Sequence, residues 1–256
     1  MDEANRLIPD GVYTTFRTYE KNKVLDIEGH FDRLEHSAIL LGYELKLNRE
    51  LIRKILRDVL ESLPADEARI RISVPLTGNK NLSEVYIFIE KLKTPSLEEY
   101  SRGVKVITIH FYRENPAAKT TSFIHLADEI RKKLPHDVNE AIMVDKNGRM
   151  LEGLSSNFFA ISKGKVFTDE SHVLAGLTRK MVLEIIKEVG LPVCPEGFLY
   201  SEIDQMDEAF ITSTSRGVLP VRAIDDKIIG NGKVGDLTGK IMQRYKEKIK
   251  EAIEPV

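Results

Sequence analysis

Cysteine is almost absent from this 256-residue sequence, which contains only Cys194. A single cysteine excludes an intramolecular disulfide and any multi-cysteine zinc site, and it makes a reducing, cytoplasmic compartment the expectation. The six histidines are equally poor candidates for ligands, because none stands in an HExxH pair or a comparable spacing. The sequence therefore predicts no metal site.

Long apolar runs and an excess of one charge are also missing. No apolar stretch approaches the length of a membrane span, and the first residues, MDEANRLIPDG, lack the apolar core of a secretory signal. Lysine and arginine number 38 against 40 aspartates and glutamates, so the net charge of -2 creates no field that would attract nucleic acid. With 42% hydrophobic and 30% charged residues, the composition indicates a globular protein of one large domain or two smaller ones.

Two amphipathic helices are predicted in the first half of the sequence. We expect Gly42 to end the first and Asn48 to cap the second. The first should bury the apolar residues at helical spacing, Phe31, Leu34, Ala38 and Leu41. The second should bury the corresponding set, Leu51, Ile55, Val59 and Leu60. Alternating apolar and polar residues, with a turn at Thr77–Lys80, predict strands over 12–20, 24–27, 68–76, 84–92 and 104–111.

The segment YRENPAAKTTS, with its proline and short polar residues, is typical of a connection. We therefore predict a smaller N-terminal α/β domain over 1–112, an interdomain connection over 113–118 and a larger C-terminal domain over 119–256. Because strands are followed by helices in each half, the sequence predicts two α+β domains rather than one alternating sheet.

Closely spaced turn signals predict an antiparallel meander in the C-terminal half, with strands over 140–145, 150–162 and 165–168. A helix is expected to begin with Thr178 as its N-cap and to stop at Gly190. The remaining pattern predicts helices over 124–134 and 239–253 and a strand over 207–215.

Three segments carry residues suited to binding or catalysis. The helix start AGLTRKM presents backbone N–H groups to an anion such as phosphate, and TSTSRG offers hydroxyls and amides after a strand. Lys119 lies among small residues of the connection, where burial would lower its pKa and make the amine reactive. Each has a plainer interpretation: an ordinary helix cap, a strand-to-loop turn and a solvated lysine.

Six motifs occur in one order along the chain: DGVYTTFRTY, HFDRLEHSA, AAKTTSF, LEGLSSNFF, AGLTRKMV and DEAFITSTSRGVLPV. Their order and spacing resemble those of the class IV aminotransferases. This is the fold-type IV group of pyridoxal-phosphate enzymes, which includes branched-chain aminotransferases, D-amino-acid aminotransferases and aminodeoxychorismate lyase. The resemblance runs from about residue 10 to about residue 240. It implies the two-domain α+β fold of D-amino-acid aminotransferases, with pyridoxal 5'-phosphate as the cofactor.

The resemblance also implies a role for each matching residue. Lys119 would be the catalytic residue and would bind the cofactor as a Schiff base. Glu152 would face the pyridine nitrogen and keep it protonated, while Leu174 would pack on the ring. The cofactor phosphate would be bound by a separate set of residues, Arg33, Leu177, Thr178, Ser213 and Thr214.

The substrate-binding residues are less closely defined. Tyr13 and Ser215 match positions near the substrate, although Tyr13 also suits the core of a strand. The arginine and histidine pair of the D-amino-acid enzymes is not visible in PLTGNKNLSEV. Ile124 stands where branched-chain enzymes usually have a tyrosine and D-amino-acid enzymes an aliphatic residue. Three arginines are candidates for binding the substrate carboxylate: Arg17, Arg69 and Arg71.

The activity implied is ping-pong transamination between an amino acid, branched-chain or similar, and a 2-oxo acid, through the Schiff base on Lys119. Two alternatives within the group are a D-amino-acid transaminase and an aminodeoxychorismate lyase that makes 4-aminobenzoate, a branch that GVYTT resembles. A non-catalytic phosphate-binding module is a third, but the sequence has no Walker lysine pattern and no GxGxxG after a strand. Relatives are usually homodimers and commonly have an additional strand before DGVY, so we expect a homodimer whose N-terminal sheet is one strand short.

Overall fold

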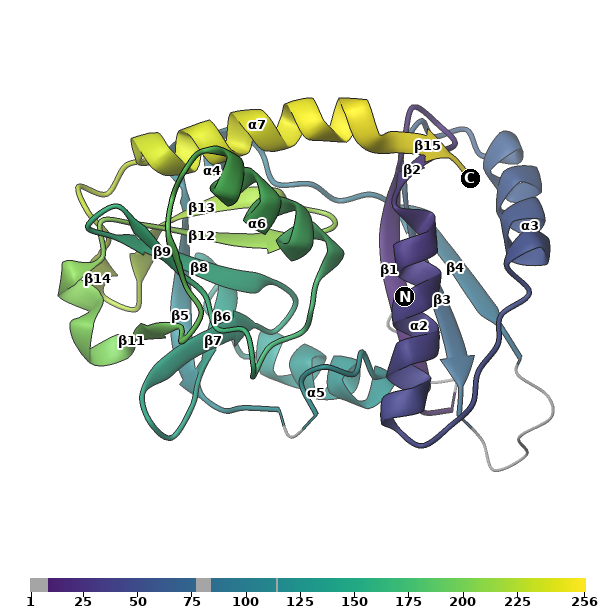
Figure 1. The fold of residues 1–256 in the computed structure, drawn as a ribbon, viewed down its shortest axis with the longest axis horizontal. Coiled ribbons are helices and arrows are strands. Elements are labelled where there is room, and N and C mark those ends of the chain that lie inside the picture. The colour runs from purple at the N-terminus through teal and green to yellow at the C-terminus, as the bar shows by residue number, and fades with distance from the viewer. Residues whose placement is uncertain (1–8, 77–83, 114) are drawn as a thin grey trace. The chain divides into compact units, whose positions relative to one another are not determined.

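The computed structural model describes residues 9–76, 84–113 and 115–256, so the expected Thr77–Lys80 turn and any strand within residues 1–8 lie outside it. The chain divides into two compact units (Figure 1). The first consists of Met1–Lys93, Ala117–Leu126 and Ile249–Val256, and the second of Thr94–Pro116 and Ala127–Lys248. Each contains strands and helices, which confirms the predicted α+β class. Among the described residues, no helix has the length and apolar character needed to cross a membrane.

An antiparallel sheet with the strand order β15-β2-β1-β3-β4 forms the first unit. Its strands are β1 (Gly11–Tyr19), β2 (Lys23–Leu25), β3 (Ala68–Pro75), β4 (Tyr86–Lys91) and β15 (Ile253–Pro255). Two helices, α2 (Ile27–Leu40) and α3 (Arg49–Ser62), share a core with the sheet. In that core, Phe16 and Ile70 of the strands join Phe31, Leu34 and Leu56 of the helices.

The predicted ends of these helices are confirmed. Leu41 is the C-cap of α2, Gly42 follows it with a φ of 81°, and the Asn48 side chain accepts a hydrogen bond from the first turn of α3. The predicted buried face of α3 was wrong except at Leu60. The helix buries Ile52, Leu56 and Leu60, and it exposes Leu51, Ile55 and Val59. The apolar stripe of α3 is wider than the face that packs on the sheet, and side-chain periodicity alone does not say which half is covered.

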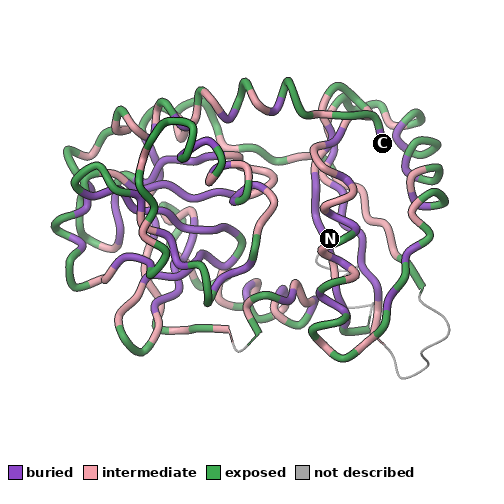
Figure 2. Tube along the Cα trace, in the orientation of Figure 1, coloured by how far each residue is buried: buried purple, intermediate pink, exposed green. Residues whose placement is uncertain are grey.

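A mixed sheet forms the second unit, with the strand order β10-β9-β8-β12-β13-β5-β6-β7-β11. An additional pairing of β7 with β8 closes the six strands from β8 to β7 into a ring. The strands are β5 (Val104–His110), β6 (Val138–Val144), β7 (Arg149–Gly153), β8 (Asn157–Ser162), β9 (Lys165–Phe167), β10 (Val193–Cys194), β11 (Phe198–Leu199), β12 (Glu208–Ser213), β13 (Gly217–Ile224) and β14 (Lys227–Ile228), which pairs with β13. Figure 2 shows most of the central strands as buried.

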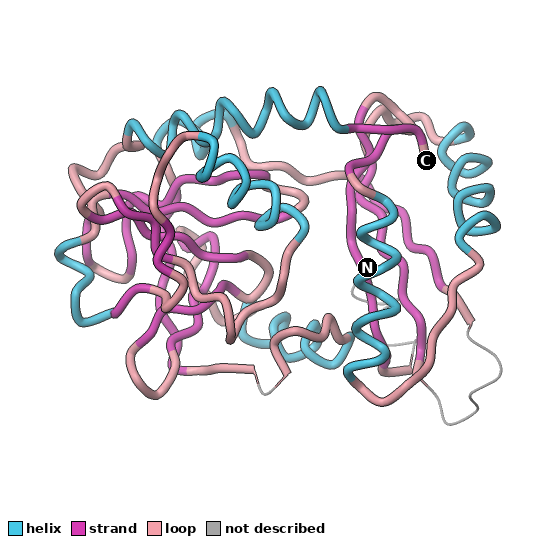
Figure 3. Tube along the Cα trace, viewed as in Figure 1, coloured by secondary structure: helices cyan, strands magenta, loops and turns pink. Residues whose placement is uncertain are grey.

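The predicted antiparallel meander is confirmed, except that the single strand predicted over 150–162 is two strands, β7 and β8, which pair with each other. The sheet as a whole is not antiparallel. β5 pairs in parallel with both β6 and β13, and β9 pairs in parallel with β10. Parallel neighbours need long connections, and the chain from β5 to β6 passes through α5 (Thr121–Arg131). The other helical segments are α4 (Leu97–Arg102), α6 (Leu177–Glu188), the 3-10 helix η1 (Tyr200–Gln205) and α7 (Asp236–Ala252), and Figure 3 distinguishes them from the strands.

The division into units differs from the predicted boundary at 113–118. Residues 94–116 belong to the second unit, because β5 lies between β13 and β6. Residues 117–126 belong to the first, because the chain there pairs with β1. Both pairings join residues far apart in the sequence, whereas the prediction used only the local composition of the connection.

Candidate active site

Backbone contacts attach the Lys119 segment to β1 and α2 in the first unit. The Tyr13 N–H donates to the Lys119 carbonyl at 3.0 Å, and Val12 pairs with Thr120 in an antiparallel bridge. The Lys119 N–H in turn donates to Oγ of Ser37 at 3.2 Å. The Nζ of Lys119 lies 4.8 Å from the centre of the Tyr13 ring. The structure therefore brings together the predicted catalytic lysine and the predicted substrate-side tyrosine.

Arg33 of α2 is held by a polar cluster with Thr14 and His30. Its Nη2 donates to Thr14 Oγ1 at 2.7 Å and to His30 Nδ1 at 3.2 Å, and these two acceptor atoms lie 2.8 Å apart. Burial, together with the charges of Arg33 and Lys119, lowers the pKa of His30 well below its usual value. The imidazole is therefore neutral at neutral pH, with Nδ1 as the acceptor for the guanidinium.

Arg33 forms no ion pair with any carboxylate of the described residues. Burial lowers the pKa of Arg33 to about 10, which leaves the guanidinium positive at neutral pH. Within residues 9–76, 84–113 and 115–256, its hydrogen bonds go to Thr14 and His30, and its Nε is buried without a partner. A positive guanidinium in these surroundings suits an incoming anion such as a phosphate.

The three arginines predicted as carboxylate binders differ in their surroundings. Arg17 forms an ion pair with Glu67 at 2.7 Å, and Arg69 forms one with Glu90. Arg71 is buried, and its guanidinium lies 5.2 Å from the centre of the ring of Tyr13. Only Arg71 of the three is therefore placed against the aromatic ring that also contacts Lys119.

Glu152, at the end of β7, is the centre of a buried polar cluster in the second unit. Its Oε2 accepts hydrogen bonds from the N–H of Leu174 at 3.1 Å and from Nδ2 of Asn157 at 3.2 Å. Its Oε1 accepts one from Nη1 of Arg113 at 3.2 Å, and these two side chains are only 5% and 8% exposed. The predicted residues Glu152 and Leu174 are thus in direct contact, through the backbone of the leucine.

The predicted N-cap of α6 was wrong by two positions. Gly176 is the N-cap, and Thr178 is a buried residue of the first turn. A Cβ on Gly176 would lie 2.4 Å from Oδ1 of Asn157, so the close approach to β8 requires glycine there. No side chain caps this helix start, so the N–H groups of Leu177 and Thr178 remain available to an anion.

The predicted phosphate loop is the tip of the hairpin between β12 and β13. Ser213 pairs with Gly217, whose φ of 61° allows the tight return of the chain. Ser213, Thr214 and Ser215 are half-buried on this loop. The preceding residue, Thr212, is buried, and its Oγ1 has no hydrogen-bond partner in the described part of the chain.

Sequence reasoning missed the residues that hold these side chains in place. His30 and Ser37 stand three residues before and four after Arg33, a helical spacing that could have identified them as neighbours on one face. Asn157 lies in the same motif as Glu152. No local signal marks Arg113, because its partner is 39 residues away in the sequence.

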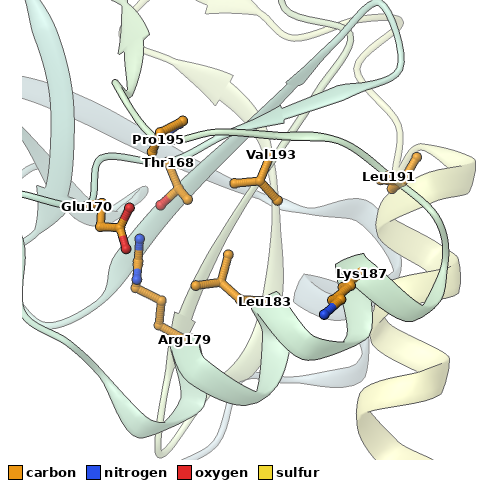
Figure 4. Close-up of a pocket in the computed structure, with 8 residues that line it drawn as sticks. All are labelled: Thr168, Glu170, Arg179, Leu183, Lys187, Leu191, Val193 and Pro195. Atoms are coloured by element: carbon orange, nitrogen blue, oxygen red, sulfur yellow. The ribbon is translucent and has the colours of Figure 1, made fainter.

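A groove beside α6 is separate from these residues. Its volume is about 360 Å³, and Figure 4 shows Arg179 directed from the helix toward Glu170, with Leu183 and Val193 facing the same space. None of the residues predicted for cofactor or substrate lines it; its lining is Thr168, Glu170, Arg179, Leu183, Lys187, Leu191, Val193 and Pro195. The predicted site residues lie in two sets, one around Lys119 and Arg33 in the first unit and one around Glu152, the start of α6 and the Ser213 loop in the second.

Comparison with known proteins identifies the family. The sequence profile of the family described as "Amino-transferase class IV" matches residues 11–224. A protein of Methanocaldococcus jannaschii named as a branched-chain-amino-acid aminotransferase is 29% identical, over 94% of this chain and 88% of its own length. A D-alanine aminotransferase of Staphylococcus epidermidis is 27% identical, over 97% of this chain and 91% of its own length.

A solved structure supports the same assignment. It belongs to a Thermotoga maritima protein named as a branched-chain amino acid aminotransferase, and it is 27% identical. Its TM-score is 0.80, and the match covers 94% of this chain and 86% of that chain. Apart from Asp10, the profile spans all six motifs, from the start of β1 to the end of β13. The chain belongs to the class IV aminotransferases and is a pyridoxal-phosphate-dependent aminotransferase.

Proposed function

We propose that this enzyme transfers amino groups between branched-chain or similar aliphatic amino acids and 2-oxo acids. The observation that carries the proposal is the cluster of Lys119, Tyr13 and Arg71. A buried guanidinium 5.2 Å from the same aromatic ring that the lysine amine contacts at 4.8 Å suits the carboxylate that amino acids and 2-oxo acids share. The names of the relatives from Methanocaldococcus jannaschii and Thermotoga maritima support the branched-chain substrate class.

The residues present fit the cofactor. Arg33 provides a positive charge that forms no ion pair within the described residues, and its Nε is an unpaired buried donor. Thr212 provides an unpaired buried hydroxyl beside the Ser213 loop. The start of α6 provides backbone N–H groups without a competing side chain. These are the partners that a phosphate dianion needs, and the residues proposed to hold it are Arg33, Leu177, Thr178, Ser213 and Thr214.

In the proposed reaction, Lys119 moves the proton and the other residues position the reactants. When bound, pyridoxal phosphate supplies a ring that withdraws electrons from the substrate Cα–H bond. The Nζ of Lys119 removes the proton from Cα, and Arg71 and Tyr13 orient the substrate carboxylate. Glu152 would keep the ring nitrogen of the bound cofactor protonated, and Leu174, whose N–H donates to Glu152, would pack against the ring. Ser215 would contact the substrate from the loop that carries Ser213.

Replacement of the lysine tests the proposal. Lys119→Ala should lose at least 10²-fold in kcat, a typical loss when a positioned proton-transfer group is removed. Lys146→Ala, at an exposed turn residue, is the matched control and should retain the wild-type rate. The measurement is the conversion of a branched-chain 2-oxo acid to its amino acid with a range of amino donors. Full activity of Lys119→Ala would show that the assignment is wrong.

A D-amino-acid transaminase is the second candidate. It is favoured by the similarity to a D-alanine aminotransferase and by the aliphatic Ile124. A screen of L and D donors with one 2-oxo acid separates the two, because each enantiomer yields product only if its Cα–H bond points toward the Lys119 amine. A lyase would instead form 4-aminobenzoate from aminodeoxychorismate without any 2-oxo acid. Incubation with aminodeoxychorismate alone, followed by measurement of 4-aminobenzoate, distinguishes that activity.

We further propose that the enzyme is a cytoplasmic homodimer. Two-fold dimers are the commonest soluble assemblies, and the family resemblance includes this state. The free thiol of Cys194 is compatible with a reducing compartment. Light scattering after size-exclusion chromatography should return twice the 29.1 kDa chain mass, and a fully active species of one chain would contradict the dimer.

A further inference from the structure

A fully buried carboxylate outside the proposed reaction anchors the turn that follows Glu152. Glu140 of β6 is 0% exposed, and its Oε2 accepts hydrogen bonds from the N–H and Oγ of Ser155 at 3.2 and 2.7 Å and from Oγ of Ser156 at 3.2 Å. A Cβ on Gly153 would lie 2.7 Å from Cγ of Glu140, so the turn lies directly against this side chain. Glu140 therefore holds the turn whose two ends carry Glu152 and Asn157.

The partner of this carboxylate comes from the predicted phosphate loop. Nη1 of Arg216 lies 3.5 Å from Oε2 of Glu140 and donates to Oγ of Ser155 at 3.0 Å and to Oγ of Ser213 at 3.5 Å. Its side chain is only 19% exposed. One guanidinium group thus connects the Glu152 turn, the buried Glu140 and the loop that begins at Ser213.

We propose that Arg216, held by Glu140, is a positioning residue for binding of the cofactor phosphate by Ser213, an inference that rests on the proposed function. A hydroxyl group has one hydrogen to donate and two lone pairs to accept with. Because Oγ of Ser213 accepts from Arg216, its own hydrogen is left to donate to an anion. The positive charge of Arg216 also favours a dianion at this loop. Arg216 acts through Ser213, and Glu140 acts through Arg216.

Loss of the ion pair between Arg216 and Glu140 should have two separable effects, one on stability and one on cofactor binding. In Arg216→Met, Glu140 becomes a buried carboxylate without its guanidinium, which lowers stability. In the double variant Glu140→Gln/Arg216→Met, the buried charge is gone and the amide oxygen of glutamine can still accept from Ser155 and Ser156, so stability should return. The orientation of the Ser213 hydroxyl should not return, because the guanidinium is still missing.

The experiment titrates the apo protein with pyridoxal 5'-phosphate and records the dissociation constant, the ³¹P chemical shift of the bound phosphate and the thermal midpoint. Arg216→Met should raise the dissociation constant roughly 10- to 100-fold, the value of one hydrogen bond to a charged group, and should move the ³¹P shift. Arg216→Lys, which keeps the charge, should recover part of the affinity. Arg222→Met, an exposed arginine of β13, is the matched control and should bind like the wild type.

The double variant distinguishes a role of Arg216 in positioning Ser213 from a role in protein stability alone. Recovery of the thermal midpoint with affinity still lost and the ³¹P shift still moved supports the proposal. Recovery of both midpoint and affinity shows a purely structural pair and overturns it, as does unchanged affinity in Arg216→Met. A wild-type protein that binds no pyridoxal phosphate would instead refute the proposed cofactor site, so the two failures are distinguishable.

Discussion

The burial of His30 predicts that the protein loses stability at mildly acidic pH. Its pKa in the folded protein is lowered well below 6.5, mainly by burial, so the folded state stays unprotonated there while the unfolded state binds a proton. The free energy of unfolding must therefore fall as the pH decreases through 6.5. With an unfolded pKa of about 6.5, one such group removes about 1.3 kcal/mol between pH 7.5 and pH 5.5.

The variant His30→Asn removes the titrating group and keeps an acceptor near the position of Nδ1 for Thr14 and Arg33. It should be less stable than the wild type at pH 7.5, because the contact of the imidazole with Phe16 at 5.1 Å is lost. Its stability should nevertheless depend less on pH, by about 1.3 kcal/mol over the same interval.

The assay is urea unfolding of the apo protein at pH 5.5 and pH 7.5, followed by far-ultraviolet circular dichroism. His36→Asn, which replaces an exposed histidine of the same helix, is the control and should keep the pH dependence of the wild type. If wild type and His30→Asn lose the same free energy on acidification, His30 is not held neutral in the folded state and the reasoning is refuted.

Two further predictions concern single side chains and use the same unfolding assay. Gly176→Ala should destabilise the protein by about 1–3 kcal/mol, because a Cβ 2.4 Å from Oδ1 of Asn157 displaces the amide that links Glu152 to Leu174. Gly239→Ala, within α7 and with open space around the added Cβ, should instead stabilise the protein by about 0.5–1 kcal/mol. Equal changes in stability in the two glycine variants would contradict the crowding at Gly176. Leu56→Ala should cost about 2–5 kcal/mol and the half-exposed Leu51→Ala well under 1 kcal/mol, an order that would reverse if the predicted face of α3 were the buried one.

The fold was predictable from the sequence where the determining interactions are local. The cap at Asn48 and the end of α2 at Gly42 depend on hydrogen bonds and backbone angles within a few residues, and both were identified. The covered half of α3 and the parallel pairing of β5 depend on partners far along the chain, and these predictions were wrong or missing. Thr178 was misassigned because a threonine cap is the commoner choice, whereas the crowding at Asn157 requires a glycine N-cap two residues earlier.

For the candidate site, too, some residues were predictable from the sequence and others were found only in the structure. Lys119, Arg33 and Glu152 came from the order of the motifs, which carries family information that the residue types alone do not. Their partners came only from the structure, because Arg113 and Glu152 are 39 residues apart in the sequence and Lys119 contacts Ser37 across 82. The proposal of Arg71 among three arginines also needed the structure, since of the three it is Arg71 that lies over the ring of Tyr13.

The return of the chain to the first unit has a consequence for synthesis on the ribosome. β15 pairs with β2, the backbone carbonyl of Val256 accepts from Arg57, and the side chain of Val256 is in the same core as Phe31. The sheet that begins at residue 11 can therefore acquire its edge strand β15 only after residue 255 has been synthesised. Until then, while the second unit is being synthesised, one edge of β2 has no partner strand. The nascent chain is expected to need protection from aggregation until residues 253–255 have emerged and can pair with residues 23–25.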